Sequence, residues 1–111
     1  MTVDVDLAAR IRELIETEPD LTEKKMFGGL AFLVGGNMAI AASGQGGILV
    51  RADPADSAGL VEQTRAELAV MRGRPMSGWL RVDAKHLPTK RDLAEWVEIG
   101  VSYARSLPAN R

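Results

Sequence analysis

The feature that most constrains the fold is a pair of short apolar segments joined by glycines, within residues Lys24–Ala42. Every position of 30–34 and of 38–42 is apolar. Gly35, Gly36 and Asn37 lie between the two segments, and these residue types tolerate the positive φ of a tight hairpin turn. We therefore predict two antiparallel strands. Because both of their faces are apolar, we expect a helix, a loop or another subunit to cover the second face.

Helix and strand patterns flank this hairpin. Apolar side chains recur at helical spacing over residues 6–18, and Pro19 ends that pattern. Asp53-Pro54 and Thr89 are typical helix starts, and Asp92 completes an approximate capping box with Thr89. The predicted elements are, in order, a helix over 6–18, strands over 30–34, 38–42 and 48–51, a helix from 54 to about 63–67, strands over 68–71 and 78–82, and a helix from 89 to 107. This order predicts an α+β fold of two layers, with a five-stranded, mainly antiparallel sheet packed with helices.

Length and composition exclude several classes of protein. At 111 residues we expect a single domain over 1–111. The sequence has no cysteine, which excludes disulfides and thiolate chemistry. We expect no secretion signal, because the first residues are acidic, and no membrane span, because no apolar run approaches the roughly 18 residues that one needs. We expect a cytoplasmic protein that binds no membrane and needs no cofactor.

Charge is distributed unevenly along the chain. Residues 1–23 carry seven acidic side chains against two arginines, whereas residues 65–91 carry seven basic side chains against two acids. The basic segment is either a face for an anionic partner or a neighbour that neutralises the acidic segment. We favour neutralisation, because a nucleic-acid-binding domain is usually basic overall and the net charge here is −1.

Two sets of residues are candidate contacts. Lys24 and Lys25, beside the glycines at 28–29, are candidates with Arg72 and Arg74 for contact with a phosphate-like anion or a nucleic acid. Methionine, aromatic and proline side chains also flank these positions, and such side chains occur at adaptable binding surfaces as well as in cores. The candidate interaction surface comprises Met26, Phe27, Pro75, Met76 and Trp79.

Catalysis has little support in the sequence. His86 is the single histidine, and neither Asp83 nor Asp92 stands at a recognised ligand or catalytic spacing from it. The serines lack the context of an activated nucleophile. We predict no catalytic and no metal-binding residue.

Several motifs, in order along almost the whole chain, resemble one family. They are Lys-Met-Phe-Gly-Gly-Leu-Ala-Phe at 25–32, Gly-Asn-Met at 36–38, Leu-Val-Arg at 49–51, Gly-Arg-Pro-Met at 73–76 with Gly-Trp at 78–79, Trp-Val at 96–97 and Ala-Arg-Ser-Leu-Pro at 104–108. Together they are similar to the TfoX (Sxy) N-terminal domain family. The resemblance implies a small α+β fold like that of secretion chaperones, and no catalytic residues to carry over.

The resemblance also bears on function. Full-length TfoX proteins regulate natural competence in bacteria and carry a second, helical domain, which we expect to be missing after Arg111. We therefore predict a non-catalytic regulatory or protein-interaction module that acts through a protein partner or as a homodimer. The alternative is a nucleic-acid or anion binder that uses a basic face, and the least favoured reading is a small enzyme that uses His86.

Overall fold

The computed structural model describes residues 5–26, 28–44 and 46–109, which form three α-helices, six strands and a short 3-10 helix. In order these are α1 (Val5–Ile15), β1 (Leu21–Met26), β2 (Gly29–Val34), β3 (Asn37–Ala42), β4 (Ile48–Arg51), α2 (Pro54–Gln63), β5 (Glu67–Met71), β6 (Arg74–Val82), η1 (Ala84–His86) and α3 (Lys90–Ser106). The strands form one antiparallel sheet in the order β1-β2-β3-β4-β6-β5. The α+β prediction is confirmed.

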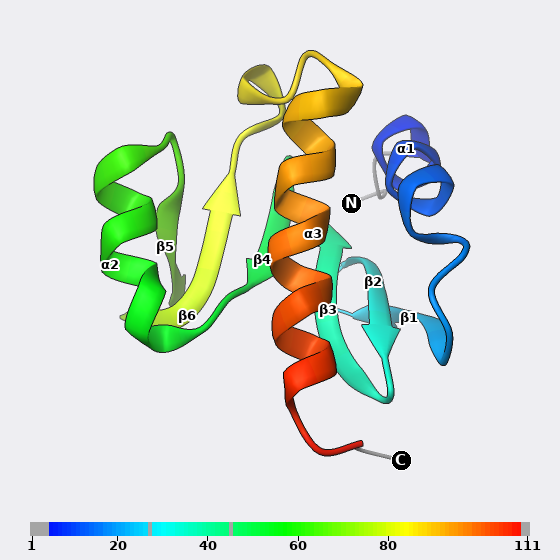
Figure 1. The fold of residues 1–111 in the computed structure, drawn as a ribbon. Helices are drawn as coiled ribbons and strands as arrows, with labels where there is room; N and C mark the ends of the chain where they lie inside the picture. Colours follow the sequence, from blue (N-terminus) through cyan, green and yellow to red (C-terminus); the bar gives the residue numbers. More distant parts are fainter. Residues whose placement is uncertain (1–4, 27, 45, 110–111) are drawn as a thin grey trace.

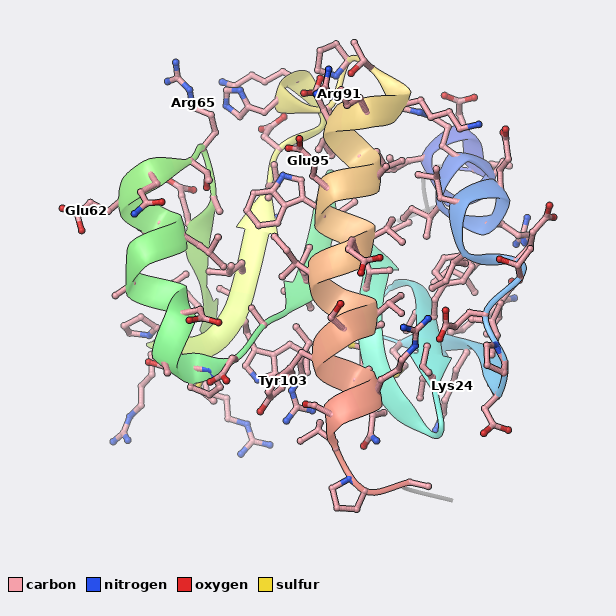
Figure 2. The ribbon with its side chains drawn as sticks, viewed as in Figure 1. Lys24, Glu62, Arg65, Arg91, Glu95 and Tyr103 are labelled. Carbon is pink, nitrogen blue, oxygen red and sulfur yellow. The ribbon has the colours of Figure 1, made fainter. Side chains whose placement is uncertain are left out.

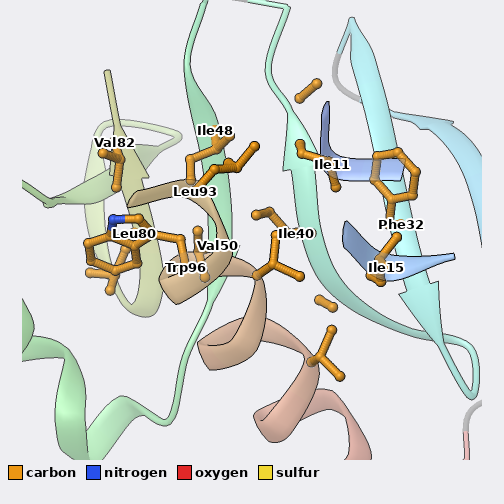
Figure 3. Close-up of a cluster of buried hydrophobic side chains, with 14 of the residues drawn as sticks. Ile11, Ile15, Phe32, Ile40, Ile48, Val50, Leu80, Val82, Leu93 and Trp96 are labelled. Atoms are coloured by element: carbon orange, nitrogen blue, oxygen red, sulfur yellow. The ribbon is translucent and has the colours of Figure 1, made fainter. Parts of the chain in front are cut away.

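The helices lie side by side on one face of this sheet, with α3 between α1 and α2 (Figure 1). α3 packs on β3 and β4, α1 packs on α3, and α2 packs on β6. The main core fills the space between the two layers (Figure 3). Phe32, Ile40 and Leu80 from the strands, and Ile11 and Leu93 from the helices, have no exposed surface. Burying each such side chain contributes about 1.5–3 kcal/mol to folding.

A close backbone contact holds α3 on the sheet. A Cβ atom added at Gly100 would lie only 2.3 Å from the carbonyl oxygen of Ala39 on β3. The helix is also fixed at both ends: Thr89 and Asp92 form the predicted capping box, and the Asn37 side-chain amide donates a hydrogen bond of 2.9 Å to the carbonyl of Pro108. The beginning of β3 is therefore joined to the segment that follows α3.

The hairpin formed by β2 and β3 confirms the central prediction. Gly35 and Gly36 form a two-residue turn with φ of +61° and +83°, and Val34 pairs with Asn37. Gly29 allows a close backbone approach, since a Cβ atom would lie 2.1 Å from the carbonyl oxygen of Ala42. The irregularity in the pairing of β2 with β3 lies further on, between Phe32 and Leu33.

The predicted strand count was wrong by one, because β1 was missed. β1 is an edge strand whose middle positions, 22–25, are polar and exposed. It forms because its backbone pairs with β2 along its whole length, and not because its own sequence alternates. A fork of two hydrogen bonds, each 2.8 Å, also joins Arg12 of α1 to Glu23 of β1. These bonds hold the pKa of the Glu23 carboxyl below its usual value.

Two element boundaries differ from the prediction by three residues or more, whereas α2 ends at Gln63, within its predicted range of 63–67. α1 ends at Ile15, three residues early, and the chain then turns through Asp20, whose φ is +60°. β6 begins at Arg74, four residues early, because its polar first half pairs with β5 across the two-residue turn at Arg72 and Gly73. In each case backbone pairing or chain reversal decided a boundary that the side-chain pattern left open.

The acidic beginning of the chain meets the last part of the basic segment 65–91. Lys90 at the start of α3 pairs with Glu13 of α1 at 3.0 Å, and Arg10 donates a 2.8 Å hydrogen bond to the carbonyl of Leu87. Arg65, Arg72 and Arg74 belong instead to the part of the fold formed by α2, β5 and β6. No helix within the described ranges has the length and apolar character that a membrane crossing requires.

Candidate functional site

A groove runs between α2 and α3 on the helical face of the molecule. It consists of two adjoining hollows, of about 650 Å³ and 870 Å³, which share Leu60, Gln63, Glu98 and Ile99. The two helices run in opposite directions, so the start of α2 lies beside the end of α3 (Figure 1). We call this feature the α2–α3 groove.

The inner surface of the groove is apolar. Leu60 of α2 and Ile99 of α3 face each other across the middle of the groove, and both are partly exposed. Toward the start of α3, Val82 of β6 and Trp96 of α3 line the groove and are 2% and 8% exposed. Trp96 also belongs to the main core cluster (Figure 3), so the same indole contributes to the core and to the groove.

Small side chains line the α2 side of the groove. Ala52, Ala55 and Gly59 all face it. A Cβ atom added at Gly59 would meet no atom within 4 Å, in contrast to Gly100. Glycine inside a helix costs about 1 kcal/mol relative to alanine. Packing within the domain therefore does not explain Gly59, whose position leaves the groove open.

Charged side chains line the two ends of the groove differently. Asp53 and Asp56 line the end formed by the start of α2 and the end of α3, and Glu98 lines both hollows. The other end is mixed, with side chains of both signs: Arg65, Arg91, Asp92, Glu95 and His86. Figure 2 shows Arg65 beyond the end of α2, Arg91 near the start of α3 and Tyr103 at the opposite end of the groove. The groove lining thus contains five carboxylates: Asp53, Asp56, Asp92, Glu95 and Glu98. In the described part of the chain, no lysine or arginine forms an ion pair with any of them.

The four predicted anion contacts lie at opposite edges of the sheet. Lys24 and Lys25 are on β1, one edge strand, and their cross-strand pairs Ala31 and Leu30 place them on opposite faces. Arg72 and Arg74 are in the hairpin that joins β5, the other edge strand, to β6. The lysine pair and the arginine pair do not share a strand or a pair of neighbouring strands, and all four residues lie outside the α2–α3 groove.

The predicted interaction residues also divide into groups. Met26 and Trp79 pack on a second apolar cluster. The buried members of this cluster are Ala31, Met38 and Ala41, on the face of the sheet opposite the helices. No helical residue belongs to this cluster, so within the described ranges the helices do not cover that face. Self-association through that face stays a prediction, which light scattering of the purified protein tests.

The remaining three residues of that set lie at or near the β5–β6 hairpin or outside the described ranges. Pro75 and Met76 are exposed on β6, Met76 by 37%. Phe27 lies outside the described residues.

Trp79 has a second contact, because the guanidinium of Arg51 lies 4.7 Å from the centre of its ring and 5.6 Å from that of Tyr103. This stacking is typical of a cation held between aromatic rings.

His86 ends η1 and lines the mixed end of the groove. Its backbone N–H donates a hydrogen bond to the Asp83 carbonyl, and Asp92 accepts hydrogen bonds from Thr89 as part of the helix cap. The Asp83 carboxylate accepts a hydrogen bond from the Lys85 N–H as the cap of η1. Asp83 and Asp92, neither of which was predicted to act with His86, therefore have structural roles at the starts of η1 and α3. Among the residues that the structure describes, no three histidine or acidic side chains are placed to hold a metal ion.

The sheet order and the single helical layer define a class of small, two-layer α+β domain whose outer face carries an open groove. Comparison with protein families gives the particular assignment. The model of the TfoX N-terminal domain matches residues 13–104, and the chain belongs to that family. The match starts within α1 and ends within α3, so it includes both walls of the groove. No curated protein matches the chain.

Proposed function

We propose that this domain is a non-catalytic protein-interaction module, and that a short helical segment of a partner protein binds in the α2–α3 groove. The observation that carries the proposal is the groove itself, with its apolar inner surface at Leu60, Val82 and Ile99 and its charged ends. Apolar grooves between helices are a common mode of peptide recognition. The regulatory role implied by the family resemblance is part of the same proposal, because a partner that binds in the groove would regulate through its binding alone, without a chemical step.

The walls of the groove favour a helix over an extended peptide. Both walls are α-helices, whose backbone N–H and C=O groups are largely paired within each helix, so the walls offer no strand edge for an extended chain to join. A helical segment satisfies its own backbone and presents apolar side chains at i, i+3, i+4 and i+7. The small side chains at Ala55 and Gly59 let such a helix approach α2 closely.

The dimensions of α2 set the length of the segment. α2 has 10 residues, which corresponds to about 15 Å at 1.5 Å per residue. A partner helix of about 12–14 residues spans this wall. Helices of this length are only marginally stable alone in water, so the partner segment gains its order on binding.

The proposal is tested by selection from a displayed library of 14-residue, helix-stabilised peptides with randomised positions. The library is selected on the wild-type protein and counter-selected on the Gly59→Trp variant, whose indole enters the groove. Ala58→Trp is the matched control, because Ala58 is exposed on the same helix and does not line the groove. Circular dichroism establishes that both variants are folded.

We expect selected peptides to bind the wild type and the Ala58→Trp variant with equal affinity. The Gly59→Trp variant should bind them at least tenfold more weakly. Failure to enrich any peptide, or binding that is unchanged in Gly59→Trp, overturns the proposal. In parallel, the affinity of the protein for duplex DNA is measured across a salt series. Tighter binding of DNA than of any peptide, with an affinity for DNA that falls in Arg72→Ala and Arg74→Ala, would support the anion-binding alternative instead.

A further inference from the structure

The charges around the α2–α3 groove are strongly unbalanced. Five carboxylates line it, against two arginines and one histidine. Asp53, Asp56 and Glu98 line a hollow that has no basic side chain in its lining. Asp53 accepts a hydrogen bond from the Ala55 N–H as the cap of α2, and the hydroxyl of Ser102 donates one to Glu98. Neither contact supplies a positive charge, and Arg105, which is paired with Glu18, acts on Glu98 only at longer range than an ion pair.

On this basis, and resting on the proposed function, we propose that the groove selects a cationic amphipathic helix. The basic side chains of that helix lie over the hollow lined by Asp53, Asp56 and Glu98. Its apolar stripe packs on Leu60 and Ile99, and its other end lies between Arg65 and Arg91 and is neutral or weakly acidic.

The physical reason is the desolvation of the carboxylates. A helix that covers Asp56 and Glu98 removes water from both groups, which is unfavourable unless a positive charge pairs with them. Lysine and arginine have long apolar stems, so they can cross the small side chains at Ala55 and Gly59 and still place their charges beside the carboxylates. A neutral helix loses this compensation, and an acidic helix is repelled.

Because of these charges, the groove suits a different class of partner from the basic residues elsewhere on the molecule. A nucleic acid carries closely spaced phosphates, which these five carboxylates repel. Lys24, Arg72 and Arg74 lie outside the groove. The partner class for the groove is therefore a basic protein segment.

The test uses the peptides selected on the wild-type protein, with their affinities measured by fluorescence polarisation at 50 and 300 mM salt. We expect the enriched peptides to carry a net positive charge, with lysine and arginine concentrated in one half of the sequence. Asp56→Asn and Glu98→Gln should each weaken binding by about threefold. Glu62→Gln is the matched control, because Glu62 is exposed on α2 and points away from the groove (Figure 2).

Two outcomes overturn this inference and leave the proposed function standing. One is an enriched pool of neutral or acidic peptides that still lose affinity in Gly59→Trp. The other is equal weakening by Glu62→Gln and by the two groove substitutions, which would indicate a general effect of net charge. If no peptide is enriched at all, the proposed function fails together with the inference.

Discussion

The same substitution, glycine to alanine, should have opposite effects in the two helices that form the groove. Gly100 of α3 faces β3, and an added Cβ atom would lie 2.3 Å from the Ala39 carbonyl oxygen and 2.9 Å from its carbonyl carbon. Gly59 of α2 faces the groove, and an added Cβ atom would meet nothing within 4 Å. Both residues lie inside helices, so the intrinsic preference of a helix for alanine is the same for each.

The magnitudes follow from these distances. The shortest ordinary contact of a Cβ atom is about 3.4 Å, so α3 would have to move from β3 by about 1 Å, which loosens Val97 and Val101 in the core. Extra atoms in a packed core cost about 1–3 kcal/mol, and the gain in helix preference is about 1 kcal/mol. Because the contact is with rigid backbone, we expect Gly100→Ala to destabilise the domain by about 2 kcal/mol. Gly59→Ala should stabilise it by about 0.5–1 kcal/mol.

Urea unfolding followed by far-ultraviolet circular dichroism measures both changes under one set of conditions. We expect the two variants to differ by about 3 kcal/mol in the free energy of unfolding, with unchanged slopes against urea. A Gly100→Ala variant as stable as the wild type would refute the close packing of α3 on β3. A Gly59→Ala variant that is clearly less stable would show that Gly59 does not face open space, and the groove would then lose its main structural support.

Three further substitutions test contacts that hold the fold together. Asn37→Ala removes the hydrogen bond to the Pro108 carbonyl, and thermal unfolding should show a loss of about 1 kcal/mol; an unchanged melting temperature would mean that this contact contributes nothing. Thr89→Ala should cost about 1 kcal/mol through the lost cap of α3, whereas Thr89→Ser should retain most of the stability. Glu23 has a lowered pKa because Arg12 donates hydrogen bonds to it, so its contribution is complete above the unfolded pKa of about 4.5 and is lost as the pH falls through the lower folded value. The difference in stability between wild type and Glu23→Gln should therefore shrink below pH 4.5; a difference that stays constant down to pH 2 would contradict this assignment.

The fold could be predicted where side-chain pattern and local backbone chemistry agree. Gly35 and Gly36 require positive φ, and the capping box of α3 can be read from Thr89 and Asp92, so both elements were predicted close to their observed positions. β1 has no such signal. Its Thr-Glu-Lys-Lys core is polar on both faces, and it becomes a strand only because β2 offers a free edge. Pairing between distant segments is not encoded in a local pattern.

The groove could not be predicted, for a related reason. The apolar stripe of α3 was visible in the sequence, and the structure buries Leu93, Trp96 and Val101 as that stripe predicts. The distance between α2 and α3 depends on the two strands, β4 and β6, that lie beneath them. The sequence of neither helix indicates this distance. Gly59 is a partial signal, because a glycine inside a helix is unfavourable, but only the structure shows that packing does not require it.

The central place of α3 in the helical layer has a consequence for synthesis on the ribosome. Residues 90–106 are made after all six strands, yet they cover β3 and β4, whose side chains are among the most buried in the domain. Until α3 emerges, the growing chain exposes the apolar surface at Ile40, Ile48 and Val50, a risk for association with other nascent chains. The core therefore closes only when α3 is added, and a ribosome paused before residue 90 would hold a chain whose apolar surface on β3 and β4 is still uncovered.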